Sequence, residues 1–278
     1  MNKLYKRATI LAFELNDQIH YCWVLGNQNN PALLFIPGYT GIHSDLLEVA
    51  ERLKEKYFVI IPDLPGWGKS PRFSAELTMQ NYAKYLKSFL DYLEVQHITL
   101  VGHCMGAVIS IELTHENPDL VSKLFLVSTP YLQGTSYQHF FSHLNHFARR
   151  SPKRIRPIFF VWRSRIITTP YTFYTLKVKS FRKRMRLVVK SFKYQPKQLE
   201  DTVEENFSSM MDYNFERVKN ITSPIHLIHG AKDQLITPNR AVLFHELIPQ
   251  ASLDLIPDAG HIPPTETPHT LARLILTY

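Results

Sequence analysis

The sequence predicts an α/β fold in which a mostly parallel sheet is flanked by helices, and three observations support this. Short β-rich runs alternate with helix-like segments along the chain. Several of these runs, such as residues 98–101, are apolar without polar alternation, as expected of strands buried on both faces. No Gly/Ser- or Pro-rich linker and no repeat divides the 278 residues, which favours one domain.

The predicted elements follow from the periodicity of the apolar residues. The strands, in chain order, are residues 19–25, 33–36, 58–61, 98–101, 124–127, 225–228 and 253–256. Residues 82–93 have helical spacing, and one stripe of this helix is expected to pack in the core (Tyr82, Tyr85, Leu86, Leu90 and Leu93). Between 131 and 200 the strand pattern stops. We therefore predict a core formed by 1–130 and 201–278, with an inserted helical cap at 131–200.

Composition and cysteine usage limit the setting of the protein. With 45% apolar and 20% charged residues, the chain has the composition of an ordinary globular protein. Two cysteines cannot form a disulfide framework, so a reducing, cytoplasmic compartment is expected. The apolar run 8–13 ends at Glu14 and is too short for a signal peptide. No uncharged stretch reaches the roughly 18 apolar residues that a membrane span needs.

The net charge of +8 is concentrated in one segment. Residues 120–199 hold 17 of the 32 Lys and Arg residues and none of the Asp and Glu residues, so the rest of the chain carries −9. Within this segment, 181–193 has a basic amphipathic pattern. A solvated cap surface, an anionic substrate or an anionic lipid surface would each suit this charge. We expect peripheral contact with an anionic membrane and no nucleic-acid partner, because no nucleic-acid-binding module accompanies the charge.

A nucleophile motif follows the predicted strand 98–101. It reads Gly102-His103-Cys104-Met105-Gly106 and leads into a helix-compatible stretch. A tight strand-to-helix turn holds its central residue in a strained backbone and needs small neighbours. The start of a helix also favours a thiolate over a thiol. Taken alone, the pentapeptide fits a buried structural cysteine equally well.

Two further motifs favour the catalytic interpretation. Asp233 follows strand 225–228 and His261 follows strand 253–256, so nucleophile, acid and base come in the order required. Catalytic groups of open α/β sheets gather beyond the carboxyl ends of the strands, where all three residues lie. Asp258, which lies close to His261 in the sequence, is an alternative acid. Asp233 fits the required order of the three residues better.

With these motifs, the chain resembles the α/β-hydrolase superfamily over nearly its whole length. Two further stretches carry the resemblance: Pro37-Gly38-Tyr39-Thr40-Gly41 is similar to the family's oxyanion loop, and residues 63–70 are similar to its Asp-x-x-Gly-x-Gly-x-Ser turn. The usual nucleophile is serine, and the loop usually begins His-Gly. Cysteine nucleophiles occur in the superfamily, for example in dienelactone hydrolases and polyhydroxyalkanoate synthases.

The resemblance implies a catalytic triad and a covalent thioester intermediate. Cys104 would attack an acyl carbonyl, His261 would take its proton, and Asp233 would orient the imidazole. The amides of Tyr39 and Met105 would form the oxyanion hole. Gly38 and His103 are the expected substrate-binding residues.

The predicted function is therefore acyl hydrolysis of a small-molecule carboxylic ester, thioester or lactone, with lipid and fatty-acyl compounds among the candidate substrates. Two alternatives stay open: an acyltransferase of the same fold, and a non-catalytic ligand-binding protein that keeps the fold. Epoxide and haloalkane hydrolysis are disfavoured, because they need a carboxylate at the position of Cys104.

No motif requires a cofactor or a metal. Gly68-Lys69-Ser70 resembles the end of a phosphate-binding loop, but that loop needs glycine where Asp63 stands. His226 and His229 would point to opposite faces of a strand, so we interpret them as packing residues. Three cap histidines share a predicted helical face, and a metal site there is conceivable but disfavoured without a carboxylate or thiol nearby (His139, His143 and His146).

Overall fold

The structure, a computed structural model, describes residues 8–15, 17–39, 43–134, 185 and 199–278. In this part of the chain eight strands form one sheet in the order β1-β2-β4-β3-β5-β6-β7-β8. Their bounds are β1 Thr9–Leu15, β2 Gln18–Leu25, β3 Ala32–Ile36, β4 Phe58–Pro62, β5 Ile98–His103, β6 Val121–Val127, β7 Ile225–Gly230 and β8 Ser252–Ile256. β2 pairs antiparallel with β1 and β4, whereas the pairs from β4 to β8 are parallel. The predicted mostly parallel α/β fold is confirmed.

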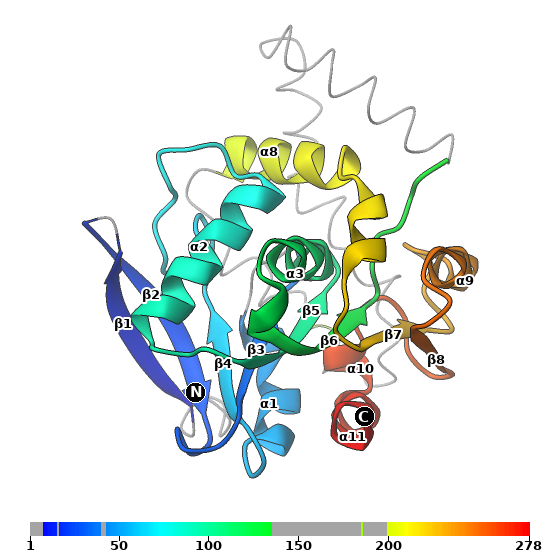
Figure 1. The fold of residues 1–278 in the computed structure, drawn as a ribbon, viewed down its shortest axis with the longest axis horizontal. Coiled ribbons are helices and arrows are strands. Elements are labelled where there is room, and N and C mark those ends of the chain that lie inside the picture. The colour runs from blue at the N-terminus through cyan, green and yellow to red at the C-terminus, as the bar shows by residue number, and fades with distance from the viewer. Residues whose placement is uncertain (1–7, 16, 40–42, 135–184, 186–198) are drawn as a thin grey trace, which may run out of the picture.

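Helices cover both faces of the sheet (Figure 1). Their bounds are α1 Leu47–Leu53, α2 Met79–Tyr92, α3 Met105–Glu116, α8 Leu199–Met211, α9 Pro238–Leu247, α10 Pro263–Glu266 and α11 Pro268–Thr277. One core cluster joins α2, α3 and α9 to the sheet, and the other joins α1 and α11 to its opposite face. Two apolar layers therefore fix the sheet between helices, as the buried apolar strands predict.

The seven predicted strands correspond to β2–β8. β1 was not predicted. β1 lies at the edge of the sheet and buries only one side chain, Phe13. The apolar run 8–13 therefore lacks the pattern of a core strand, and only its antiparallel pairing with β2 reveals it. The predicted helix at 82–93 is also longer than expected at its start, where the Thr78 side chain accepts from the Asn81 amide and caps α2.

α3 is the central helix of the described fold, and nearly all of its side chains are buried. Its one buried acid, Glu112, accepts a hydrogen bond from the Tyr213 hydroxyl at 2.9 Å and pairs with Arg217 at 3.3 Å. A buried carboxylate is tolerated when such partners replace water. Because α3 is held on all sides, the residue that precedes it, Cys104, has a fixed position.

The predicted cap at 131–200 lies almost wholly outside the described residues. The same holds for its three spaced histidines and for the basic stretch 181–193, apart from Met185. No helix within the described ranges is long and apolar enough to cross a membrane.

Candidate active site

Cys104 occupies the sharp turn between β5 and α3. Its backbone angles are φ 51° and ψ −116°, an unusual conformation for a residue other than glycine. The Cys104 amide donates to the Val127 carbonyl at 2.9 Å, which ties the turn to the end of β6. Such strain persists only where the surrounding structure enforces it, and it occurs most often at functional sites. The geometry agrees with the nucleophile turn that the sequence predicts.

The two glycines of the motif are required by close packing. A Cβ atom on Gly106 would lie 2.4 Å from the carbonyl oxygen of Ile36 and 2.5 Å from that of Pro37. A Cβ atom on Gly102 would lie 2.3 Å from the Ser110 hydroxyl oxygen. The start of α3 therefore lies against the end of β3, which places the Cys104 turn beside the loop that follows β3.

Gly106→Ala is expected to lower the free energy of unfolding by about 1–3 kcal/mol, because the two carbonyls it meets belong to the backbone and cannot move aside easily. Thermal and urea unfolding measure this change. Gly134→Ala is the control, since Gly134 has φ +72° and nothing within 4 Å of the added atom. This control introduces backbone strain at a positive φ but no steric crowding. A Gly106→Ala variant as stable as the wild type would contradict the packing argument.

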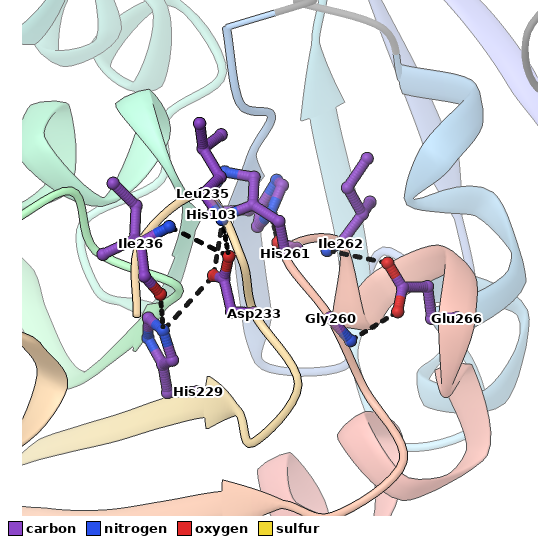
Figure 2. A network of polar contacts seen from close by, with 9 residues as sticks. All are labelled: His103, His229, Asp233, Leu235, Ile236, Gly260, His261, Ile262 and Glu266. Carbon is purple, nitrogen blue, oxygen red and sulfur yellow. Dashed lines mark hydrogen bonds and ion pairs between the residues drawn. The ribbon is translucent and has the colours of Figure 1, made fainter. Parts of the chain in front are cut away.

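Asp233 and His261 meet beyond the ends of β7 and β8 (Figure 2). The Nδ1 atom of His261 lies 2.8 Å from Oδ2 of Asp233, and both side chains are buried. The other carboxylate oxygen accepts from the amides of Leu235 at 2.8 Å and Ile236 at 2.9 Å. The carboxylate is thus fixed by its own loop, and it leaves Nε2 of His261 as the nitrogen available for chemistry.

Two of these groups have shifted pKa values. Burial alone would raise the pKa of Asp233, but hydrogen bonds from His229 and His261 hold it well below its usual range. Burial opposes a charge on His261 as well. The electrostatic influence of Cys104, followed by the hydrogen bond with Asp233, nevertheless raises the pKa of His261.

Cys104 is the neighbour that raises the pKa of His261 most, so the two side chains lie near each other. The structure thus brings together the three residues that the sequence places at separate strand ends. An imidazole that lies near a thiol and is hydrogen bonded to a buried carboxylate can receive a proton from the first and keep its orientation through the second. The catalytic roles themselves stay predictions.

The loop after β3 lies against the same turn. A Cβ atom on Gly38 would be 3.2 Å from Cβ of Cys104, so the backbone of this loop passes beside the cysteine. Tyr39 follows it, and Met105 begins α3 directly after the cysteine. Both residues flank Cys104 as an oxyanion hole requires. The predicted donation by their amides stays a prediction.

His103 has a partner within the protein. The ring is 6% exposed, and its Nε2 atom donates to the carbonyl oxygen of His261 at 2.9 Å. A Cβ atom on Gly38 would lie 2.8 Å from Nδ1 of His103. His103 therefore lies between the segments that carry Gly38, Cys104 and His261. Its predicted contact with substrate, like that of Gly38, stays a prediction.

The interpretation of His229 as a packing residue is incomplete. Its Nε2 atom lies 2.8 Å from the carbonyl oxygen of Ile236 and 3.2 Å from Oδ2 of Asp233. The sequence signal for this contact is the spacing of four residues between His229 and Asp233, because the strand ends between them and the chain turns back. His226, three residues earlier, instead hydrogen bonds with Ser252 at 2.7 Å.

Glu266 is a second residue that the sequence analysis missed. Its carboxylate accepts from the amide of Gly260 at 2.5 Å and from the amide of Ile262 at 3.2 Å (Figure 2). It therefore holds the backbone on either side of His261. A glutamate five residues after the predicted base, at the end of a short Pro-started helix, is the signal that could have identified it.

The two alternative motifs have different structural roles. Asp258 is exposed and pairs with Lys232 at 2.7 Å, so the residue at the imidazole is Asp233. In the turn 63–70, the buried carboxylate of Asp63 accepts from the Lys69 amide at 3.0 Å and lies 2.7 Å from Nδ1 of His43. A carboxylate of the chain itself thus occupies the turn that resembles a phosphate loop.

The comparisons with known proteins agree with the fold. The family model described as alpha/beta hydrolase fold matches residues 31–268. An uncharacterised hydrolase of Bacillus subtilis (strain 168) is 25% identical over 256 residues, 91% of each chain. Lipase 3 of Moraxella sp. (strain TA144) is 27% identical, over 86% of this chain and 74% of that protein.

Solved structures have the same fold. The crystal structure of a putative lipase from Acinetobacter baumannii AYE superposes with a TM-score of 0.78 at 20% identity and covers 98% of this chain and 91% of its own. At this identity the likeness concerns the fold alone. The match of the family model over most of the chain goes further: the chain belongs to the alpha/beta hydrolase fold family and is a hydrolase of that family.

Proposed function

We propose that this hydrolase cleaves acyl compounds, namely carboxylic esters, thioesters or lactones, through a covalent thioester on Cys104. The observation that carries the proposal is the hydrogen bond between His261 and Asp233 beside Cys104, which lies at a strained turn and raises the pKa of His261. The similarity to Lipase 3 of Moraxella supports acyl substrates, including fatty-acyl ones.

The first half of the reaction forms the acyl-enzyme. The sulfur of Cys104 attacks the carbonyl carbon, and the proton of the thiol resides on Nε2 of His261. The negative charge moves to the carbonyl oxygen, where the amides of Tyr39 and Met105 would bind it. When the intermediate collapses, the bond to the leaving alcohol or thiol breaks, and His261 gives the leaving group its proton.

The second half releases the acid. A water molecule gives a proton to His261 and attacks the thioester carbonyl. The carbon–sulfur bond then breaks and Cys104 is regenerated. Asp233 remains ionised throughout and keeps Nδ1 of His261 protonated, so that only Nε2 exchanges protons.

Intact-mass spectrometry tests this proposal directly. The protein is mixed with p-nitrophenyl acetate, butyrate and octanoate and quenched in acid, and the same is done with Cys104→Ala. We expect a mass gain equal to the acyl group in the wild type alone. Added alcohol tests the alternative activity, because an acyltransferase would yield a new ester at the expense of the free acid. No mass gain with any ester or acyl thioester, together with no turnover, would contradict the proposal.

The pH dependence should reflect the raised pKa of His261. Cleavage of the acyl bond needs the protonated imidazole, and a histidine free in solution loses its proton near pH 6.5. Because the folded pKa is higher, kcat/KM should persist above pH 6.5 and fall only as the pH passes the raised value. The profile is measured with a thioester substrate and corrected for spontaneous hydrolysis. A decline centred on pH 6–7 would contradict the raised pKa of His261.

The basic segment 120–199 supports a second proposal, peripheral binding to anionic membranes. A Lys or Arg near an anionic leaflet contributes about 1 kcal/mol, and this segment contains 17 of them. We expect the protein to sediment with vesicles of phosphatidylserine and phosphatidylcholine at low salt and to be released at high salt. Equal sedimentation with neutral vesicles, or none with anionic ones, would contradict this.

A further inference from the structure

The loop that carries His261 has little secondary structure of its own. It joins β8, which ends at Ile256, to α10, which begins at Pro263, so no strand or helix fixes the backbone of His261. Yet a proton acceptor in a thiol–imidazole pair must lie within a few tenths of an ångström of its productive position. The Lys232 amide donates to the Ala259 carbonyl at 2.8 Å and holds the first part of this loop, whereas side chains hold the backbone around His261.

Glu266 holds the loop from one side. Its two carboxylate oxygens accept from the amides of Gly260 and Ile262, which directly precede and follow His261. A carboxylate that bridges two backbone amides fixes both peptide planes, because hydrogen bonds to an ionised acceptor are stronger than neutral ones. Neither bond involves the carbonyl of His261 itself, which lies between the two amides.

His103 holds that carbonyl from the other side, since its Nε2 atom donates to it at 2.9 Å. Burial, followed by the nearby charge of His261, lowers the pKa of His103 to about 3, so the ring is neutral. With its hydrogen on Nε2, a neutral His103 has none on Nδ1, the atom that faces Gly38. The ring centroids of His103 and His261 are 5.6 Å apart, a distance at which a second positive charge would be repelled.

We propose that His103 is a positioning residue that fixes the distance between Cys104 and His261. His103 precedes Cys104 in the chain and donates a hydrogen bond to the backbone carbonyl of His261. Glu266 accepts hydrogen bonds from the amides of the same loop (Figure 2). This deepens the proposed acyl hydrolysis and rests on it for its catalytic consequence. It also accounts for a polar ring at a buried position beside the nucleophile.

The test compares His103→Leu with His103→Gln. Leucine fills part of the space without a donor, whereas glutamine can still donate to the His261 carbonyl. We expect His103→Leu to lower kcat about 10- to 100-fold, as small misplacements of catalytic groups do, with KM within about twofold of the wild type. His103→Gln should recover most of this loss. His226→Leu is the matched control, because it removes another histidine hydrogen bond outside the site.

A second measurement does not depend on any substrate. Iodoacetamide alkylates thiols, and burial raises the pKa of the other cysteine, Cys22, to about 12, so the reaction reports on Cys104. Cys104→Ser should therefore take up no label. We expect His103→Leu to slow alkylation towards the rate of His261→Gln, and Glu266→Gln to act in the same direction. His103→Gln and His226→Leu should react at nearly the wild-type rate.

The outcomes separate the two proposals. If the wild type neither turns over nor forms an acyl-enzyme, the proposed function fails, yet alkylation still tests the positioning. An unchanged alkylation rate in His103→Leu would overturn the inference, as would equal losses in His103→Leu and His103→Gln when both fold. A rise in KM alone would overturn it in favour of a substrate contact. If His103→Leu does not fold, Glu266→Gln decides: a wild-type alkylation rate overturns the inference.

Discussion

Replacing Cys104 by alanine is expected to lower kcat by about 10⁴- to 10⁶-fold, the range seen when a covalent nucleophile is removed. The loss should be this large because no acyl-enzyme can form without the sulfur, so water would have to attack the substrate directly. Burst-phase kinetics with p-nitrophenyl esters measure it, since the burst should disappear together with the steady-state rate. Unfolding should change little, because alanine fits where the thiol was.

Cys104→Ser is the matched variant. It keeps a nucleophile on the same strained turn, and serine is the residue that the family usually has there. We expect activity between that of the wild type and that of the alanine variant, and an acyl-enzyme that resists neutral hydroxylamine, since an ester reacts more slowly than a thioester. Turnover by Cys104→Ala at more than a few per cent of the wild-type rate would show that the sulfur is not the nucleophile.

The fold could be predicted because its signals are local. β3, β4 and β5 are short, mostly apolar runs, and strands buried on both faces leave this pattern in a sequence. The Cys104 turn could be predicted for the same reason, since Gly102 and Gly106 are dictated by contacts too close for any side chain. Edge strand β1 shows the limit, because it buries one residue and depends on its partner for its structure.

The support around the site does not follow from the periodicity of the sequence, because it consists of hydrogen bonds that depend on how the loops turn. Glu266 and His103 act on the backbone of His261, and backbone hydrogen bonds to a side chain leave no periodic pattern. The alternation of side chains along a strand correctly places His226 and His229 on opposite faces of β7. It does not predict which residues each face contacts. His229 meets Asp233 only because the chain reverses after β7.

The choice of the acid shows how burial decides between equivalent residues. Asp233 and Asp258 both lie in loops after strands, but only Asp233 is buried and accepts two backbone amides. Asp258 is exposed and pairs with Lys232, and such surface ion pairs contribute about 0–1 kcal/mol. A carboxylate that orients an imidazole must itself be held in place. The hydrogen bonds from two backbone amides hold Asp233 in this way.

Asp233→Asn is therefore expected to lower kcat by about 10⁴-fold, as the equivalent change does in serine-protease triads. Asparagine can still accept from the amides of Leu235 and Ile236, so the loop should fold. Its amide group, however, can donate to Nδ1 of His261. That would force the proton onto Nε2 and leave the imidazole unable to take one from the thiol.

The same substitution makes a second, independent prediction about pH. The hydrogen bond from His261 to Asp233 is one cause of the raised pKa of His261, so its loss should move the alkaline limb of the residual activity to lower pH. Asp258→Asn is the control and should change kcat by less than about twofold, since it removes only a surface pair. If Asp258→Asn were the inactive variant and Asp233→Asn the active one, the carboxylate beside His261 would have no part in catalysis. The contact between the two side chains would then serve only the packing of the loops.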